Sequence, residues 1–173
     1  MQVVLRGSGV NARAATIGEA VAACDLVLLA TPWGVTESVI CSVDDWTGKI
    51  LVDATNPLTP DLRGLALGHT TSAAEQIAIW APGARVVKAF NSTGAQNMAD
   101  PIYGANRVTM FVCGEDVDAK TTVMSLVTEL DFEALDAGPL SRARDLEPLA
   151  MLWIHLAYSE GMGPDFAFAV IRR

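Results

Sequence analysis

Apolar positions along the chain follow two patterns that alternate. Short runs rich in β-branched and aliphatic residues are typical of buried strands, and between them apolar residues recur at helical spacing. This alternation is typical of repeated βα units and predicts an α/β fold with a mostly parallel sheet. The expected strands are Val3 to Leu5, Leu26 to Thr31, Ile50 to Ala54, Val86 to Phe90, Thr109 to Cys113 and Glu133 to Asp136.

Two short sequences predict where helices begin. In Thr16-Ile17-Gly18-Glu19 and in Ser72-Ala73-Ala74-Glu75 a hydroxyl residue precedes a glutamate by three positions, so the hydroxyl can accept from a free N–H while the glutamate reaches back. Further helices are expected from about Val35 to Cys41, from Ala119 to Leu130 and from Leu146 onward. Pro148 would then lie in the first turn of the last helix, where its missing N–H needs no partner.

The remaining pattern predicts one domain with a long loop. Proline and glycine are too dense between Asn56 and Gly68 for regular structure, and a loop of that size over strand ends is often functional. The segment from Leu149 to Tyr158 is apolar nearly all round, so it must be covered on most sides. With no repeat or linker, we expect a dinucleotide-binding part over residues 1–140 and a C-terminal helical extension over residues 141–173 of the same domain.

The composition of the chain indicates which classes of partner this domain can bind. Its 173 residues are 51% hydrophobic and its mean hydropathy is +0.32, which suggests apolar surface buried beyond a monomer core and predicts a homodimer. A net charge of −8 opposes the phosphate backbone of nucleic acid. No apolar run reaches the roughly 20 residues of a membrane span, and the N-terminal residues lack a basic region followed by an apolar stretch and a cleavage site. We therefore expect a cytoplasmic protein that binds neither nucleic acid nor membrane.

The three cysteines predict no metal site. Cys24, Cys41 and Cys113 are odd in number, far apart and set in apolar surroundings, so neither a disulfide framework nor metal-ligand spacing is present. We expect all three to be buried small hydrophobes.

Three runs at the ends of expected strands carry the candidate chemistry. They are Ala30-Thr31-Pro32-Trp33, Asp53-Ala54-Thr55-Asn56-Pro57 and Lys88-Ala89-Phe90-Asn91. In an open parallel sheet the carboxyl ends of the strands face the ligand crevice. These runs therefore predict a nucleotide cofactor site.

Together with Met110-Phe111-Val112-Cys113-Gly114, the ordered set resembles the NADP oxidoreductases that use the deazaflavin coenzyme F420. Met151-Leu152-Trp153-Ile154-His155-Leu156 after Leu146-Glu147-Pro148 also matches the actinobacterial-type members, so the resemblance extends over essentially the whole chain. It implies a Rossmann-like fold and direct hydride transfer between reduced F420 and NADP. Other relatives of the family reduce different partners.

The resemblance also implies roles for the strand-end residues. Thr31, Pro32 and Trp33 would lie along the adenosine-to-nicotinamide path, Asn56 and Pro57 near the nicotinamide, and Asn91 would close the reacting face. Hydride transfer depends on positioning, so we assign no general acid or base. In the alternative interpretation, the prolines end strands, the asparagines satisfy turn backbone and the tryptophan fills the core.

The start of the chain departs from the family pattern. The family begins with a strand, a glycine-rich turn and a helix that binds the pyrophosphate, whereas Gln2 to Ser8 resembles the family's second strand and the loop after it. Arg6 and Ser8 would then bind the 2′-phosphate of NADP. Alternatively, Gly7 to Ala12 is itself a phosphate loop of the form G-x-G-x-x-A, although the capping sequence at Thr16 places the helix start too late for this.

Several other polar or flexible side chains allow two interpretations. Lys88, on an apolar strand, needs a buried partner or binds a phosphate, and we favour structural pairing. His69 and His155 lack a nucleophile or metal ligand at useful spacing and are expected to be satisfied polar residues. Met98, Trp153 and Met162 could line a deazaflavin pocket, but core or dimer contact is favoured.

Three functions remain open at this point. The first is hydride transfer between NADP(H) and coenzyme F420. The second is a non-catalytic, truncated Rossmann-like domain that dimerises without binding nucleotide. The third is reduction of a flavin or a metal chelate by the same fold.

Overall fold

The computed structural model describes residues 12–173, which form a five-stranded sheet. The strand order is β1-β2-β3-β6-β7, and every neighbouring pair is parallel except β3 and β6. The mostly parallel Rossmann-like sheet is therefore confirmed, while the strand expected at Val3 to Leu5 lies outside the described residues. The strands are β1 (Leu26–Leu29), β2 (Ile50–Asp53), β3 (Arg85–Lys88), β6 (Thr109–Gly114) and β7 (Glu133–Gly138).

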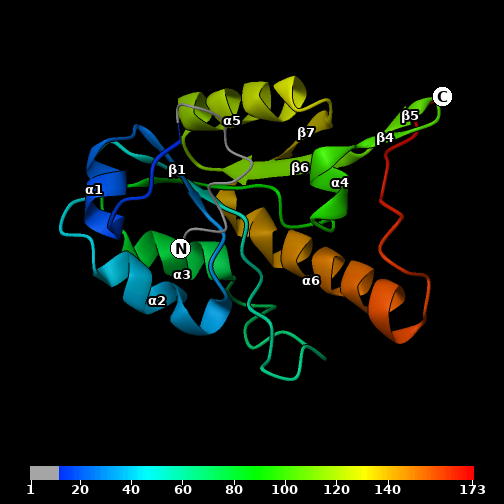
Figure 1. The fold of residues 1–173 in the computed structure, drawn as a ribbon, viewed down its shortest axis with the longest axis horizontal. Helices are drawn as coiled ribbons and strands as arrows, with labels where there is room; N and C mark the ends of the chain where they lie inside the picture. The colour runs from blue at the N-terminus through cyan, green and yellow to red at the C-terminus, as the bar shows by residue number, and fades with distance from the viewer. Residues whose placement is uncertain (1–11) are drawn as a thin grey trace.

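Helices cover both faces of this sheet. Figure 1 shows α5 on one side and α2, α3 and α6 on the other; we call these sides the α5 face and the α3/α6 face. A short helix and a two-stranded hairpin connect β3 to β6. The elements are α1 (Ile17–Ala22), α2 (Trp33–Cys41), α3 (Ala73–Trp80), α4 (Gln96–Ala99), β4 (Ile102–Tyr103), β5 (Asn106–Arg107), α5 (Val117–Glu129), the 3₁₀ turn η2 (Leu140–Arg142), α6 (Ala143–Ile154) and the π-helical turn η3 (His155–Ser159).

Both predicted helix starts are present, with one difference in detail. The side chain of Thr16 caps α1, and Glu19 reaches back to the Thr16 N–H at 2.9 Å, which completes the capping box. The hydroxyl of Ser72 accepts from the Glu75 N–H at 3.2 Å and donates to the Glu75 carboxylate at 2.7 Å, and Arg144 of α6 donates to the same carboxylate. The second capping box is therefore incomplete, because the Ser72 hydroxyl and Arg144 share its glutamate.

The last helix begins earlier than the sequence predicts. It starts at Ala143, so Pro148 lies inside α6 and not in its first turn. Arg142 and Arg144 pair with Asp145 and Glu75, respectively, and these contacts stabilise a turn that the apolar pattern does not mark. Pro148 removes one N–H donor from the middle of the helix.

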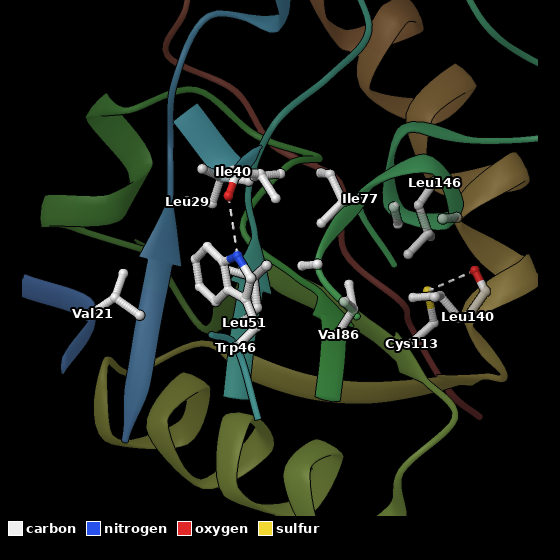
Figure 2. Packing of buried hydrophobic residues seen from close by; sticks show 13 residues of the cluster. Val21, Leu29, Ile40, Trp46, Leu51, Ile77, Val86, Cys113, Leu140 and Leu146 are labelled. Carbon is white, nitrogen blue, oxygen red and sulfur yellow. Dashed lines mark hydrogen bonds between the residues drawn. The ribbon is translucent and has the colours of Figure 1, made fainter. Parts of the chain in front are cut away.

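Two apolar clusters form the core, one on each face of the sheet. Figure 2 shows the cluster on the α3/α6 face, where the Trp46 indole donates to the Ile40 carbonyl at 3.2 Å. The cluster on the α5 face includes Val52, Val123 and Phe132. Successive residues of a strand point to opposite faces, so β2 and β3 supply both clusters.

Only one of the three cysteines lies where the sequence predicts. Cys113 is buried on β6, but Cys24 and Cys41 are exposed. The expectation of three buried cysteines was wrong because Cys24 lies in the short connection before β1 and Cys41 is the last residue of α2. Within residues 12–173, no group of three or more His, Cys, Asp or Glu side chains could bind a metal ion.

The C-terminal residues fold back onto the sheet. Trp153 stacks on Phe166 with ring centroids 5.3 Å apart, and its indole donates to the Phe166 carbonyl at 2.9 Å. Further along, the Thr109 N–H donates to the Phe168 carbonyl at 3.1 Å. Among the described helices, none is both long enough and apolar enough to span a membrane.

Candidate functional site

A cavity of about 770 Å³ lies where β1 and β2 end. Three segments form its walls: the turn from β1 into α2, the residues directly after β2, and the long loop before α3. This is the carboxyl edge of parallel strands, where open α/β sheets bind ligands. The lining residues are Ala30, Thr31, Pro32, Trp33, Gly34, Ala54, Thr55, Asn56, Leu58, Thr59, Pro60, Leu62 and Ala66.

The wall after β1 is fixed by short-range contacts. Pro32 is the N-cap residue of α2, with a φ of −57°, which suits a proline. The hydroxyls of Thr31 and Thr36 lie 2.9 Å apart, and the Thr36 hydroxyl donates to the Pro32 carbonyl at 3.1 Å. Trp33 packs against Trp80 of α3, with ring centroids 5.5 Å apart. Each candidate residue of this run therefore has a defined position.

The opposite wall is the loop expected from Asn56 to Gly68, which is irregular as predicted but internally bonded. The Ala66 N–H donates to the Pro57 carbonyl at 2.6 Å, and the Thr59 N–H donates to the Gly64 carbonyl at 2.8 Å. At its tip, Leu62 is exposed with a φ of +59°, a left-handed conformation that is unusual for a leucine. The loop is thus a compact structure that presents apolar side chains to the cavity.

Asn56 and Asn91 form a reciprocal amide pair at the base of the cavity. The Asn56 Nδ2 donates to the Asn91 carbonyl and the Asn91 Nδ2 donates to the Asn56 Oδ1, both at 3.0 Å. Asn91 also donates to the Leu146 carbonyl of α6 at 3.1 Å. The Asn91 Oδ1 is buried and has no hydrogen-bond partner among the described residues.

A buried ion cluster lies directly next to this pair. The Lys88 ammonium lies 2.8 Å from the Asp53 Oδ2 and 2.9 Å from the Glu147 Oε1, and it donates to the Thr55 carbonyl at 2.6 Å. All three ionic side chains are at most 1% exposed. Asp53 also accepts from the N–H and the hydroxyl of Thr55, at 2.8 and 2.7 Å. The structural pairing favoured for Lys88 is therefore confirmed.

Burial and ion pairing shift the pKa values of Lys88 and Glu147 in opposite directions. Desolvation lowers the pKa of Lys88, but the charges of Asp53 and Glu147 outweigh it and raise the pKa above 10.5, so the ammonium stays charged. For Glu147, burial raises the pKa despite the lysine. Burial also raises the pKa of the nearby Cys113 thiol to about 12, so this thiol is not a nucleophile at neutral pH.

The structure brings together most of the strand-end candidates that it describes. Thr31, Pro32, Trp33 and Asn56 line the cavity. Pro57 is buried beside it, and Asn91 contacts it through Asn56. Arg6 and Ser8 lie outside the described residues. The alternative phosphate loop, Gly7 to Ala12, also lies outside them except for its last residue. No Arg or Lys among residues 12–173 lines the cavity.

The other residues with two interpretations lie outside this cavity. His69 is exposed, and the Nε2 of His155 lies 3.1 Å from Glu160. Met98 lines a different, apolar cavity of about 510 Å³ on the α5 face. Trp153 is buried and Met162 is exposed. They do not share one deazaflavin pocket.

Two features of the site were missed by sequence reasoning. Asp53 and Glu147 were not recognised as partners of Lys88, and the loop residues Leu58 and Leu62 were not singled out. The signal for Asp53 was available, because Asp53 and Lys88 both end apolar strands. A single glutamate before a proline in α6 gave no such signal.

The residues present fit the nicotinamide end of a dinucleotide. A cavity of this size is within the range of small-molecule sites, which combine apolar walls with few polar groups. Here Trp33 and the loop supply apolar walls, and the Asn56 amide, whose position is fixed by Asn91, supplies a hydrogen-bonding group. A carboxamide could pair with this amide.

Comparison with known proteins identifies related reductases. The family model described as NADP oxidoreductase, coenzyme F420-dependent, matches residues 3–57. The F420-dependent NADP reductase of Methanothermobacter marburgensis is 31% identical over 152 residues, which cover 83% of this chain and 67% of that protein. The rat metalloreductase STEAP3 is 38% identical over 118 residues, which cover 66% of this chain.

A solved structure has the same overall arrangement. It comes from Arthrobacter sp. FB24, carries the name of a proposed F420-dependent NADP reductase, and superimposes with a TM-score of 0.83 at 33% identity. The match covers 91% of this chain and 74% of the other. By contrast, this chain spans only 23% of the length of the rat metalloreductase.

Proposed function

Because this chain belongs to the family of F420-dependent NADP reductases, we propose that it transfers hydride between NADP(H) and coenzyme F420 in the cavity at the ends of β1 and β2. The observation that carries the proposal is the shared cavity wall. Thr31, Pro32, Trp33 and Asn56 come from two separate strand-end runs and line one cavity of about 770 Å³.

Positioning is the task of these residues. NADPH supplies the hydride when it is bound. The Asn56 amide is fixed by Asn91, so it can orient a carboxamide at little cost in conformational entropy. Trp33 and the apolar side chains of the loop exclude water from the ring that lies against them. No residue of the cavity needs to gain or lose a proton.

The proposal extends to residues outside the cavity. Arg6 and Ser8 would bind the 2′-phosphate of NADP, since a guanidinium suits bidentate phosphate contact. Residues 1–140 would form the dinucleotide-binding part and residues 141–173 its helical extension. Contacts from the extension to the site, such as that of Asn91 to the Leu146 carbonyl, support a single domain.

Titration with NADPH and a turnover assay test the main proposal. The wild-type protein should bind NADPH in calorimetry and change the absorbance of oxidised F420 when both cofactors are present. Asn56→Ala should weaken NADPH binding by about tenfold, because one oriented amide contributes about 1 kcal/mol or more. Asn106→Ala, in the exposed β5, is the matched control and should bind as the wild type does.

Absence of NADPH binding would contradict the proposal and would favour the second function considered from the sequence, a domain that binds no nucleotide. A folded wild-type protein that binds no NADPH at millimolar concentration would be a non-catalytic domain. NADPH binding without turnover of F420 would instead exclude only the second cofactor.

Reduction of a flavin or a metal chelate is the alternative to F420. The similarity to the rat metalloreductase favours it, since that match is stronger in identity than the others described. A ferric chelate and a free flavin, each offered with NADPH in place of F420, distinguish the acceptors by the rate of NADPH oxidation.

We also propose a homodimer. Trp153 and Ala157 are buried, whereas Leu152, Tyr158 and Met162 are exposed on the same C-terminal segment. The apolar stretch from Leu149 to Tyr158 is thus covered on one side within the chain. Light scattering coupled to size exclusion should give twice the mass of one chain, and Leu152→Glu should shift it toward the monomer.

A further inference from the structure

The long loop that lines the cavity is attached to the fold at two places, and both lie next to the Lys88 cluster. At its start, the Thr55 carbonyl accepts from the Lys88 ammonium at 2.6 Å. At its end, the N–H groups of Ala73 and Ala74 donate to the Glu147 carboxylate at 3.0 and 3.3 Å. Lys88 and Glu147 themselves are 2.9 Å apart. One ion pair therefore connects the two ends of the loop.

This arrangement differs from an ordinary helix start. The Ser72 hydroxyl already caps α3 from within the loop, yet two further N–H groups of the first turn bond to a carboxylate of α6. The positive end of the helix dipole favours that charge, which offsets the excess of two carboxylates over one ammonium. Glu147 thus fixes the end of the loop relative to β3, although it belongs to the C-terminal extension.

Stability alone gives little reason for such a cluster. Replacing a buried ion pair by apolar residues of similar volume is often neutral or stabilising, while the charges can specify one conformation. Here the conformation specified is that of the loop, because the backbone hydrogen bonds of residues 57–70 connect only residues of the loop with one another and with Asn56. The same cluster also fixes Thr55, the residue before Asn56.

We propose that Lys88 and Glu147 are positioning residues of the nucleotide site, which hold residues 57–72 at both ends and thereby set the shape of the cavity. The inference rests on the proposed function for its ligand, NADPH. It assigns the C-terminal extension a part in the site without any direct contact with the ligand.

Amide hydrogen exchange separates this role from a general effect on stability. Glu147→Gln removes the charge but retains one acceptor, so the fold should persist. Exchange in peptides covering residues 57–72 should accelerate by about tenfold or more, while peptides from α5 should exchange at the wild-type rate, because local opening and global unfolding are distinct. Glu147→Asp, which keeps the charge on a shorter side chain, should give an intermediate rate.

Glu75→Gln is the matched control. Glu75 also links α3 to α6, through Arg144, and it does not contact Lys88. Its carboxylate accepts from the Ser72 hydroxyl at 2.7 Å, a hydrogen bond that the glutamine oxygen can retain. This variant should leave exchange in residues 57–72 within about twofold of wild type.

NADPH titration of the same variants completes the test. Glu147→Gln should weaken NADPH binding by about three- to tenfold, and Glu147→Asp should recover part of the loss.

Three outcomes would overturn the positioning role: unchanged exchange in residues 57–72, an equal acceleration in α5, or faster loop exchange with unchanged NADPH affinity. If Glu147→Gln does not fold, Glu147→Asp decides by the same criteria. If the wild type binds no NADPH, the proposed function fails, and the exchange data still decide whether the pair holds the loop.

Discussion

The two faces of the sheet are packed with different kinds of side chain. On the α5 face, an apolar cluster around Val52, Val123 and Phe132 fills the interior, and no charged side chain among residues 12–173 is buried there. On the α3/α6 face, a similar cluster surrounds three buried ionic groups. The charged face is the one that carries the candidate site of about 770 Å³, whereas the smaller cavity of about 510 Å³ on the α5 face has an apolar lining. The comparison indicates that apolar packing holds the sheet together, whereas the ion cluster defines the geometry of one edge.

The largest effect is expected for Lys88→Met, which leaves two carboxylates without their counterion. Removing one partner of a buried pair typically costs about 3–5 kcal/mol, and we expect a loss of that size in the free energy of unfolding measured with urea. Lys120→Met is the control on the α5 face, because that ammonium pairs with the half-exposed Asp136 at 2.9 Å. Lys120→Met should lower the free energy of unfolding by less than about 1 kcal/mol. Equal losses in the two variants would remove the distinction between the faces.

Val123→Ala tests the apolar face. The side chain is fully buried on α5, so its truncation should cost about 2 kcal/mol through lost burial and the cavity left behind. Denaturant unfolding gives this value, and calorimetry should give a wild-type affinity for NADPH. A weakened affinity in this variant would mean that both faces shape the site.

Gly94→Ala tests the packing between the loop after β3 and α6. A Cβ at this position would overlap the Trp153 ring, and Trp153 is buried. We expect a loss of about 1–2 kcal/mol from overpacking, seen as a lower melting temperature. Gly18→Ala, where a Cβ meets nothing within 4 Å, should not destabilise, since alanine is the better helix former.

The smallest effect is expected at the partly exposed pair of Glu75 and Arg144. The hydrogen bonds from Arg144 lower the pKa of Glu75 below 4.5, so the pair stabilises the fold above the unfolded pKa. This contribution disappears as the pH falls through the lower, folded value. Glu75→Gln should cost about 1 kcal/mol or less at neutral pH, and the difference from wild type should vanish in acid. A difference that grows in acid would contradict this assignment.

Local sequence signals predicted the elements whose causes are local. The strand runs of β2 and β6 and the caps at Thr16 and Ser72 depend on residues close in the sequence, and all are present. The start of α6 was misplaced because a pair between Arg144 and Glu75, 69 residues apart, stabilises its first turn. Such a partner cannot be read from a periodic pattern.

Part of the candidate cavity was predicted from the sequence. The strand-end rule gave Thr31, Trp33 and Asn56 as neighbours, since the carboxyl edge of a parallel sheet is fixed by topology, but their roles toward a cofactor stay predictions. Glu147 was missed because its burial depends on the α3 N–H groups and on Lys88, which only the folded chain brings near it. The roles of Arg6 and Ser8 stay predictions.

The antiparallel junction between β3 and β6 has a consequence for how the molecule unfolds. Only two residue pairs join these strands, Val87 with Gly114 and Lys88 with Cys113, so the sheet consists of two parallel blocks with a narrow seam. Lys88 lies on that seam, and its bond to Glu147 crosses from the first block to a helix that follows the second. The two apolar clusters also contain residues of both blocks, so we expect the ion cluster to add to an apolar coupling of the two halves, and its loss to reduce the cooperativity of unfolding.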